Sequence, residues 1–482
     1  MALQLLTEAA HSGPDPLALL PEIFLLAGAI TALLTGSFLA RQRQWITRLI
    51  AVVALLASAA AALAALGAPE ASVYEGSYTV DAATGGARLI VAVSALLVIL
   101  LGRDELKGTD RESEHHALVL LASLGAVVLA GTSDLLVLGV AFLLASVPLY
   151  ALIGMNRTRG GAEAALKTYL MGALLGIALL LGVTITYGLA GTTGYAGLAS
   201  GMATAPGAAV AVGLLGIIAG LMFKAGAVPG HFWVPDAAQG AGTASAAFAT
   251  TVPKVGGFIA AYRLLDAVHG TVNWPLLIAV LAALTMTLGN LAAYTQDDPR
   301  RLLGWSTVSQ AGYLLMPVAV AGSVPLALPA LLVYLAGYAV SNLAAFAVTA
   351  AYPDRRTLAG FQGLGSARPW HAGALVVSLL SLVGTPPTAV FLGKLTVFTA
   401  AWDGGFWWLT VIAALNTTVS LFYYLRWIAP VFRTAGPDTP GAGDFSPRPW
   451  AARTAVGAAF LILAFGITAG LAWAMLAGAP HS

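Results

Sequence analysis

The sequence predicts an all-α integral membrane protein with about 14 transmembrane helices. Hydrophobic residues make up 59% of the 482 positions, charged residues make up only 9%, and the mean hydropathy is +0.86. A water-soluble domain of this size carries far more charge on its surface. Because a helix needs about 20 apolar residues to cross a hydrocarbon core about 30 Å thick, each apolar run is a candidate span.

The apolar runs follow one another along the chain, and their boundaries are good to about 3 residues. Two runs are irregular, around Pro229 and Pro386, so they are predicted to be broken helices. The predicted spans lie near residues 17–40, 46–66, 87–101, 116–130, 133–154, 165–189, 207–226, 242–266, 275–295, 301–321, 326–350, 371–400, 405–429 and 451–477.

The loop cations predict the orientation, because Lys and Arg gather on the cytoplasmic side. The long loops 67–86 and 190–206 contain neither. The alternate loops hold Arg41, Arg43, Arg48, Arg103, Lys107, Arg111, Arg157, Arg159, Arg300, Arg301, Arg355, Arg356, Arg368, Arg433, Arg448 and Arg453. With fourteen spans, both termini are expected outside. Residues 1–15 lack the basic flank of a signal peptide, so the first span is expected to be retained.

Lysine is rare in this chain and is concentrated in the apolar spans. Placing an ammonium in hydrocarbon costs on the order of 2.5 to 3.5 kcal/mol, so such a residue is a functional candidate. Arginine stays protonated in proteins, whereas a lysine in apolar surroundings can release a proton and take it up again. The alternative is that these lysines reach an interface or neutralise a structural carboxylate. The candidates for a proton relay are Lys167, Lys224, Lys254 and Lys394.

Two of these lysines lie beside interruptions of a helix. Gly226 and Pro229 follow Lys224, and two prolines at 386 and 387 precede Lys394. Proline removes a backbone donor, and irregular backbone at membrane depth persists only where it is buried in protein or lines water. Breaks at matching places in two halves predict an inverted-repeat transporter. Spans four to eight then form one five-helix repeat and spans nine to thirteen form the other, although a simple packing kink is the alternative for each break.

Other ionisable groups accompany the lysines. His231 follows the first break, and its ordinary pKa near 6.5 suits a proton carrier, with a packing role as the alternative. Glu163 precedes Lys167 by four residues, so it is a candidate lysine partner or a helix N-terminal charge. The remaining carboxylates near the spans are expected to have structural roles. Asp134 and Asp236 are predicted helix caps, and Glu22 is predicted to lie at the outer interface.

The sequence excludes several kinds of chemistry within the chain. It has no cysteine, so it supplies no disulfide, thiolate metal site, iron–sulfur ligand or cysteine nucleophile. It contains no phosphate-binding glycine-rich loop and no helical His pair with metal-ligand spacing. A net charge of +2 does not suggest nucleic-acid binding. No cofactor or metal is therefore expected on this chain.

Several motifs occur in a fixed order, and together they carry a resemblance. They are Glu163–Lys167, Tyr187-Gly188, Phe223–Asp236, Val252–Lys254, Gln296–Tyr313, Pro386–Lys394 and Asn416–Arg426. The set resembles the antiporter-like membrane subunits of respiratory complex I. The last three resemble the N-type members of bacterial NADH–quinone oxidoreductase, whose sister subunits place a glutamate at the position of Lys394. The resemblance covers about residues 85 to 430.

That resemblance implies fourteen helices, two inverted five-helix repeats and a proton route in a redox-driven oxidoreductase of the bacterial inner membrane. Lys167 and Lys224 would belong to the first half, His231 and Lys254 to the connecting middle, and Lys394 to the second half. The partners would be other membrane subunits of the same complex. NADH, flavin, iron–sulfur clusters and quinone would be bound by those partners.

The spans and the resemblance together divide the chain into four parts. An N-terminal group of three helices is expected over residues 1–115, and the first antiporter-like repeat over 116–270. The second repeat is expected over 271–432, followed by a cytoplasmic loop and a last helix over 433–482.

One position departs from the resemblance. Leu143 stands where the family usually has a glutamate in the fifth span. An anion beside a buried lysine favours its charged form, so its loss should weaken charge switching in the first half. Glu163 or Asp134 would partly substitute, or the first half-channel would be impaired. The number of protons pumped per electron after Leu143→Glu distinguishes these alternatives. An unchanged number would show that the missing anion is irrelevant.

Two other functions compete with this interpretation. A subunit of a cation/proton antiporter complex or of a membrane-bound hydrogenase would use the same ancestral module, and sodium-dependent transport without a redox partner would favour it. A non-conducting structural subunit would have a dry, discontinuous core between the lysines.

Overall fold

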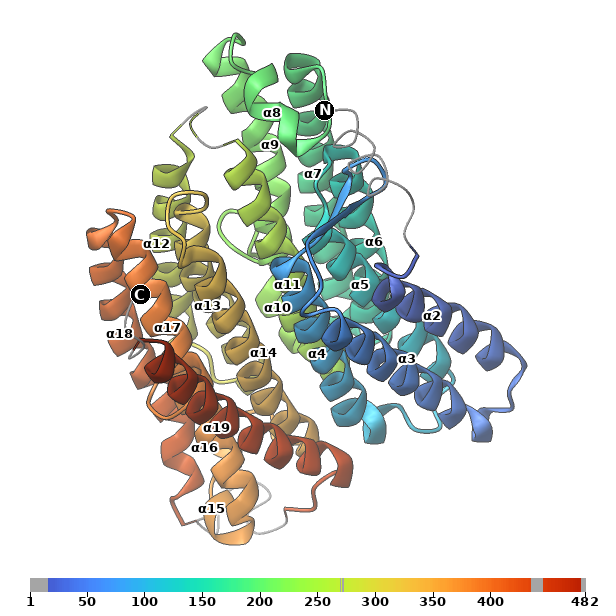
Figure 1. The fold of residues 1–482 in the computed structure, drawn as a ribbon. Coiled ribbons are helices and arrows are strands. Elements are labelled where there is room, and N and C mark those ends of the chain that lie inside the picture. Colours follow the sequence, from blue (N-terminus) through green and yellow to red (C-terminus); the bar gives the residue numbers. More distant parts are fainter. Residues whose placement is uncertain (1–15, 269, 271–272, 435–444, 478–482) are drawn as a thin grey trace.

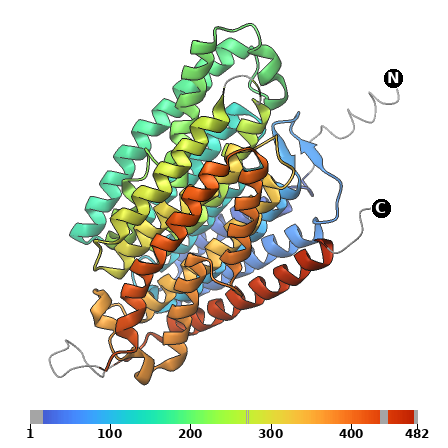
Figure 2. The ribbon, with the colours of Figure 1, turned by 90° about the vertical axis from the view of Figure 1, so that its left-hand side faces the viewer.

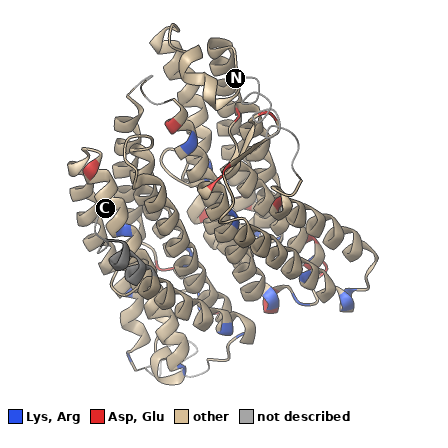
Figure 3. Cartoon of the chain, in the orientation of Figure 1, with Lys and Arg blue, Asp and Glu red and all other residues tan. Residues whose placement is uncertain are grey.

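The computed structural model describes residues 16–268, 270, 273–434 and 445–477, with side chains up to residue 468. The described part is an elongated bundle of helices with one small β-hairpin (Figures 1 and 2). Charged residues are sparse along the helices (Figure 3). Eleven helices in the described part are long and apolar enough to cross a membrane. The chain is therefore a multi-pass helical membrane protein.

The first three long helices form a group at the N-terminal end of the chain. They are α2 (Leu20–Phe38), α3 (Trp45–Ala64), which follows the short η1 (Arg41–Arg43), and α4 (Ala82–Leu106). The antiparallel strands β1 (Ala71–Val73) and β2 (Tyr78–Val80) connect α3 to α4.

The next group runs from the fourth to the eighth predicted span. Its members are α5 (Glu112–Gly131), α6 (Leu135–Gly154), α7 (Arg159–Ala190), α8 (Tyr195–Gly201), α9 (Gly207–Ala225), α10 (Trp233–Gly240) and α11 (Thr243–Ala267). Asp134 caps α6 as predicted, since its carboxylate accepts hydrogen bonds from the Leu136 and Val137 amides.

The third group follows with its own short elements. Its members are α12 (Trp274–Ala293), α13 (Pro299–Ala319), α14 (Ala327–Ala351), η2 (Leu358–Phe361), α15 (Leu364–Ala367), α16 (Pro369–Val383), α17 (Ala389–Asp403) and α18 (Trp407–Val431). The last helix, α19 (Pro449–Ala477), packs against α14, α16 and α17 and also against α4, so it joins this group to the N-terminal helices (Figure 1).

Every predicted span coincides with a helix or with a pair of half-helices. Three of them are not among the eleven apolar candidates. α11 and α13 are less apolar because they carry buried Ser, Thr, Gln and Lys side chains. α16 and α17 are each 15 residues long because the chain breaks between them.

The two predicted interruptions are present. α9 ends at Ala225, and Gly226 then takes a left-handed conformation with φ +67°. α16 ends at Val383, and Gly384 does the same with φ +91°. A residue with a Cβ is strained in this region, so glycine allows each half-helix to stop abruptly. Both half-helices therefore end inside the bundle with carbonyls that need partners.

Glu22 lies in the first turn of α2, at the predicted outer end of the first span. Its side chain is buried and accepts hydrogen bonds from the Arg88 guanidinium at 2.8 Å and from the Tyr78 hydroxyl at 2.6 Å. Arg88 lies 66 residues further along the chain, on α4. The sequence did not predict this pairing, because the partner comes from a different helix, which sequence proximity does not reveal.

Candidate proton-transfer site

Lys224 lies in the last turn of α9, just before the first break. Its side chain is 1% exposed, and Nζ donates a hydrogen bond to Ser146 Oγ at 2.5 Å. Nζ also lies 4.8 Å from the centre of the Phe142 ring. A Cβ at Gly257 would meet the Lys224 stem at 3.0 Å, so a glycine there makes room for the lysine. The amine is thus held between α6 and α11 by one hydroxyl and an aromatic face.

Lys254 lies on α11 and is fully buried. Its Nζ donates a hydrogen bond to the carbonyl oxygen of Ala225, the last residue of α9. A Cβ at Gly226 would lie 2.5 Å from this Nζ, so glycine is needed here for space as well as for its backbone conformation. Lys254 therefore satisfies a carbonyl that the break releases.

Lys394 repeats this arrangement at the second break. It lies on α17, is 4% exposed, and its Nζ donates to the carbonyl oxygen of Val383, the last residue of α16, at 2.9 Å. A second hydrogen bond goes to Thr417 Oγ1 at 3.0 Å, and the Tyr313 ring centre lies 4.1 Å away. At both breaks, a buried lysine therefore binds the terminal carbonyl of a half-helix.

No ion pair joins these three lysines to a carboxylate within the described ranges of the chain. Their partners are hydroxyl and carbonyl oxygens, together with aromatic faces. A buried charge without a counter-charge is costly, and lysine, unlike arginine, can become neutral by releasing its proton.

A chain of buried polar side chains lies between Lys254 and Lys394, and we call it the polar axis. The Tyr338 hydroxyl donates to the Thr250 carbonyl at 2.7 Å, one turn before Lys254, and to Thr307 Oγ1 at 3.1 Å. One turn along α13, Gln310 donates to the Leu382 carbonyl at 2.8 Å, beside the Val383 carbonyl that Lys394 holds. The polar axis consists of Thr250, Thr307, Gln310, Tyr334 and Tyr338.

None of the polar-axis residues was predicted from the sequence. Each is a neutral Thr, Gln or Tyr, and such residues are also common as hydrogen-bonded packing groups. Their partners come from α11, α13, α14 and α16, which are far apart in the sequence. The one available signal was the run of polar residues in α13, which is unusual for an apolar span.

His231 lies in the non-helical segment after α9, and its side chain is 3% exposed. Its ring is stacked near Phe232, with centroids 4.1 Å apart, and lies 5.9 Å from Trp305. No hydrogen bond joins the imidazole to a lysine among the residues that the structure describes. The structure thus places His231 beside the first break without linking it directly to the amines.

Lys167 stands apart from the other lysines. It is on α7, with its side chain 48% exposed, and it forms ion pairs with Glu163 at 2.7 Å and Asp236 at 2.9 Å. Asp236 does not cap a helix as predicted but also pairs with Arg301 at 2.7 Å. The candidate pairing of Glu163 with Lys167 is present. Lys167, Glu163, Asp236 and Arg301 thus form a charged surface cluster near the start of α7, on the same side of the bundle as the arginine-rich loops.

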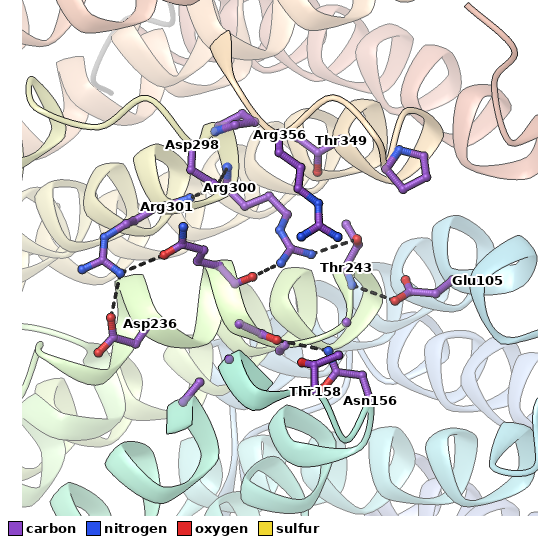
Figure 4. Close-up of a pocket in the computed structure, with 18 of the residues that line it drawn as sticks. Glu105, Asn156, Thr158, Asp236, Thr243, Asp298, Arg300, Arg301, Thr349 and Arg356 are labelled. Carbon is purple, nitrogen blue, oxygen red and sulfur yellow. Dashed lines mark hydrogen bonds and ion pairs between the residues drawn. The ribbon is translucent and has the colours of Figure 1, made fainter. Parts of the chain in front are cut away.

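The charged cluster borders a polar cavity of about 670 Å³ (Figure 4). The cavity lies among the starts of α7, α11 and α13, the segment after α14 and the start of α19. Its lining includes six arginines, which lie in segments predicted to face the cytoplasm: Arg159, Arg300, Arg301, Arg355, Arg356 and Arg448.

The structure also bears on the unusual Leu143. This side chain is 47% exposed on the outer surface of α6, whereas Ser146, one turn later, contacts Lys224. Neither suggested substitute reaches Lys224, because Glu163 pairs with Lys167 and Asp134 caps α6 and accepts a hydrogen bond from Thr193. Among the described residues, the side chain that accepts a hydrogen bond from Lys224 is that of Ser146, a hydroxyl.

The fold and these groups define a multi-pass membrane protein with lysines at two helix breaks. The family model for the transmembrane region of NADH:quinone oxidoreductases and Mrp antiporters matches residues 132–420. NADH-quinone oxidoreductase subunit N of Mycobacterium sp. (strain JLS) is 54% identical over 96% of this chain and 98% of its own length. Subunit N 1 of Streptomyces griseus is 52% identical over 95% and 97%.

Solved structures show the same fold. A chain of respiratory complex I from Thermus thermophilus with bound aureothin has a TM-score of 0.80 and 34% identity, covering 94% of this chain and 98% of that one. A chain of the Mrp complex from Dietzia also has a TM-score of 0.80, but at 23% identity it shows a similar fold alone. The chain belongs to the NADH-quinone oxidoreductase subunit N family.

Proposed function

We propose that this chain translocates protons as the N subunit of a redox-driven NADH–quinone oxidoreductase. One observation carries the proposal beyond family membership. Lys254 and Lys394 each hold the terminal carbonyl of a half-helix, and the polar axis runs between them. An amine that can exchange a proton, placed where backbone carbonyls are freed, is suited to transport through a broken-helix membrane fold.

In the proposed route, the amines of Lys224, Lys254 and Lys394 act as proton-carrying stations. Hydroxyl and amide groups of the polar axis lie between the last two, and they can donate and accept as they rotate. Ser146 orients Lys224. His231, buried at the first break, is proposed to connect the first half to the middle. Lys167, Glu163 and Asp236 are proposed to form an entrance cluster on the arginine-rich side.

The topology proposed for this function has fourteen spans, two inverted five-helix repeats and both termini outside, in a bacterial inner membrane. Each break then falls in the fourth helix of its repeat, which is the arrangement that such repeats would produce. The redox chemistry belongs to partner subunits that hold NADH, flavin, iron–sulfur clusters and quinone. This chain supplies the proton route and contacts other membrane subunits of the complex.

The test is proton pumping by the assembled complex in proteoliposomes, measured as protons per electron from NADH to quinone. Lys254→Ala and Lys394→Ala are each expected to slow coupled pumping about tenfold, the effect of roughly 1.4 kcal/mol on the barrier. The matched control is Lys107→Ala, which changes the one lysine in an exposed loop. Pumping that stays normal in an assembled Lys394→Ala complex would refute the relay.

The same vesicles separate the competing functions. Transport that requires sodium and proceeds without NADH would favour an antiporter. Loss of assembly without any change in the proton-to-electron ratio of the surviving complex would favour a structural subunit. The proposal expects normal assembly, a lowered ratio and no sodium requirement.

A further inference from the structure

The arginine-lined cavity has more cations than its own carboxylates neutralise. Arg301 pairs with Asp236, and Arg300 donates to Thr243 Oγ1 at 3.1 Å and to the Gln239 carbonyl, which are both neutral groups. Within the described residues, neither Arg300 nor Arg356 has a carboxylate within ion-pair distance. Figure 4 shows both side chains directed into this cavity.

The carboxylates that line the cavity are already engaged. Glu105 accepts hydrogen bonds from the Thr243 and Ala244 amides at the start of α11. Asp298 accepts them from the Arg300 and Arg301 amides at the start of α13. Glu163 and Asp236 are paired with Lys167, and Asp236 also with Arg301. Each of them therefore neutralises a helix end or another cation.

Six arginines and four carboxylates line the cavity, so the lining carries excess positive charge. The charge of Arg300 is disfavoured by burial, favoured by Asp298 and Glu105, and opposed by the repulsion of Arg356. Arg300 and Arg356 come from the start of α13 and the loop after α14, so the fold itself brings them together. An anion between them would turn this repulsion into attraction. Guanidinium forks match phosphate oxygens in pairs, which makes phosphate the anion that fits best.

We propose that this cavity binds a phosphate-bearing anion, held by Arg300 and Arg356. The volume of about 670 Å³ is in the range of small-molecule and headgroup sites. The phosphate is that of an anionic phospholipid headgroup or a free phosphate compound, because both present the same oxygens. Bound there, it would fix α13 against α10, since Arg300 and Arg301 also hold Gln239 of α10.

The experiment uses the chain's lack of native cysteine. Asn156→Cys places the only thiol of this chain at an exposed position on the cavity lining, and labelling in the assembled complex is read on this subunit after the subunits are separated. The rate of labelling by a charged maleimide is measured in delipidated complex, with added tetraoleoyl cardiolipin in one arm and inorganic pyrophosphate in another. Phosphatidylcholine at the same concentration is the neutral-headgroup comparison.

Cardiolipin or pyrophosphate, but not phosphatidylcholine, is expected to slow labelling. The double change Arg300→Gln with Arg356→Gln should raise the half-protecting concentration at least tenfold, because both charge-assisted contacts with the phosphate are lost. Arg433→Gln, at an exposed arginine outside the cavity, is the matched control and should change nothing. Protection by cardiolipin identifies a lipid source, and protection by pyrophosphate alone identifies a free phosphate compound.

Two results would overturn the site. One is labelling that neither phosphate probe slows in a complex whose thiol reacts readily. The other is a thiol that stays unreactive in delipidated complex and cross-links to a neighbouring subunit, because a protein segment would then fill the cavity. Neither result depends on proton pumping, so failure here leaves the proposed relay standing.

Discussion

At the scale of single residues, the three buried amines differ in what holds them. Lys254 and Lys394 bind backbone carbonyls at helix breaks, whereas the only side-chain acceptor of Lys224 is Ser146 within the described structure. A backbone carbonyl cannot be removed by mutation, but the serine hydroxyl can. Ser146 is therefore the most direct test of how Lys224 is positioned.

Ser146→Ala should lower the proton-to-electron coupling of the assembled complex. Removing a hydrogen bond to a charged group costs about 1.5 to 3 kcal/mol, so pumping attributable to Lys224 should fall roughly tenfold or more. Ser123→Ala is the matched control, since Ser123 is equally buried and its hydroxyl has no hydrogen-bonding partner among the described residues. Equal effects of the two changes would mean that Ser146 acts only through packing.

Gly226→Ala tests the first break. Alanine at φ +67° costs on the order of 1 to 3 kcal/mol, and its Cβ would press against the Lys254 amine. The expected result is a lower midpoint of thermal unfolding together with reduced pumping. Gly188→Ala, where a Cβ meets nothing within 4 Å, should alter neither. Normal pumping by Gly226→Ala complex would show that the left-handed turn is dispensable.

At the scale of elements, buried charge pairs fix helices that are distant in the sequence. The Glu22–Arg88 pair joins α2 to α4 with almost no exposure to solvent. Arg263 similarly ties α11 to the start of α4 through Asp81 at 2.5 Å. Breaking a buried pair leaves one charge without compensation, whereas an exposed pair contributes little.

Arg88→Met should destabilise the subunit by about 3 to 5 kcal/mol, because Glu22 would remain buried and unpaired. The measurement is the yield and thermal midpoint of assembled complex. Arg41→Gln removes the exposed pair with Asp110 and should cost under about 1 kcal/mol. Similar losses from the two changes would show that the buried pair does not clamp α2.

At the scale of the whole molecule, the apolar runs predicted where the helices lie, and proline and glycine predicted the two breaks. These features follow from local chemistry: burial in lipid selects apolar residues, and only certain residues permit a break. The lysines beside the breaks were identified as candidates from local sequence as well, because a lysine within an apolar run is unusual.

Features that depend on contacts between distant segments were not predictable. The pairing of Glu22 was missed because Arg88 approaches it from another helix. Asp236 was expected to cap a helix, but Arg301 and Lys167 approach it from α13 and α7. The polar axis was missed because Tyr338 and Gln310 reach their hydrogen-bonding partners only when four helices are packed together.

The shared bonding of Lys254 and Lys394 to half-helix ends has a mechanical consequence. If either amine swings away to deliver its proton, the carbonyl of Ala225 or Val383 is left bare in an apolar interior, at a cost of about 1 to 3 kcal/mol. The backbone must then turn, or water must enter, to satisfy it. In the proposed relay, each transfer therefore needs either a turn of the main chain or the entry of water at the break.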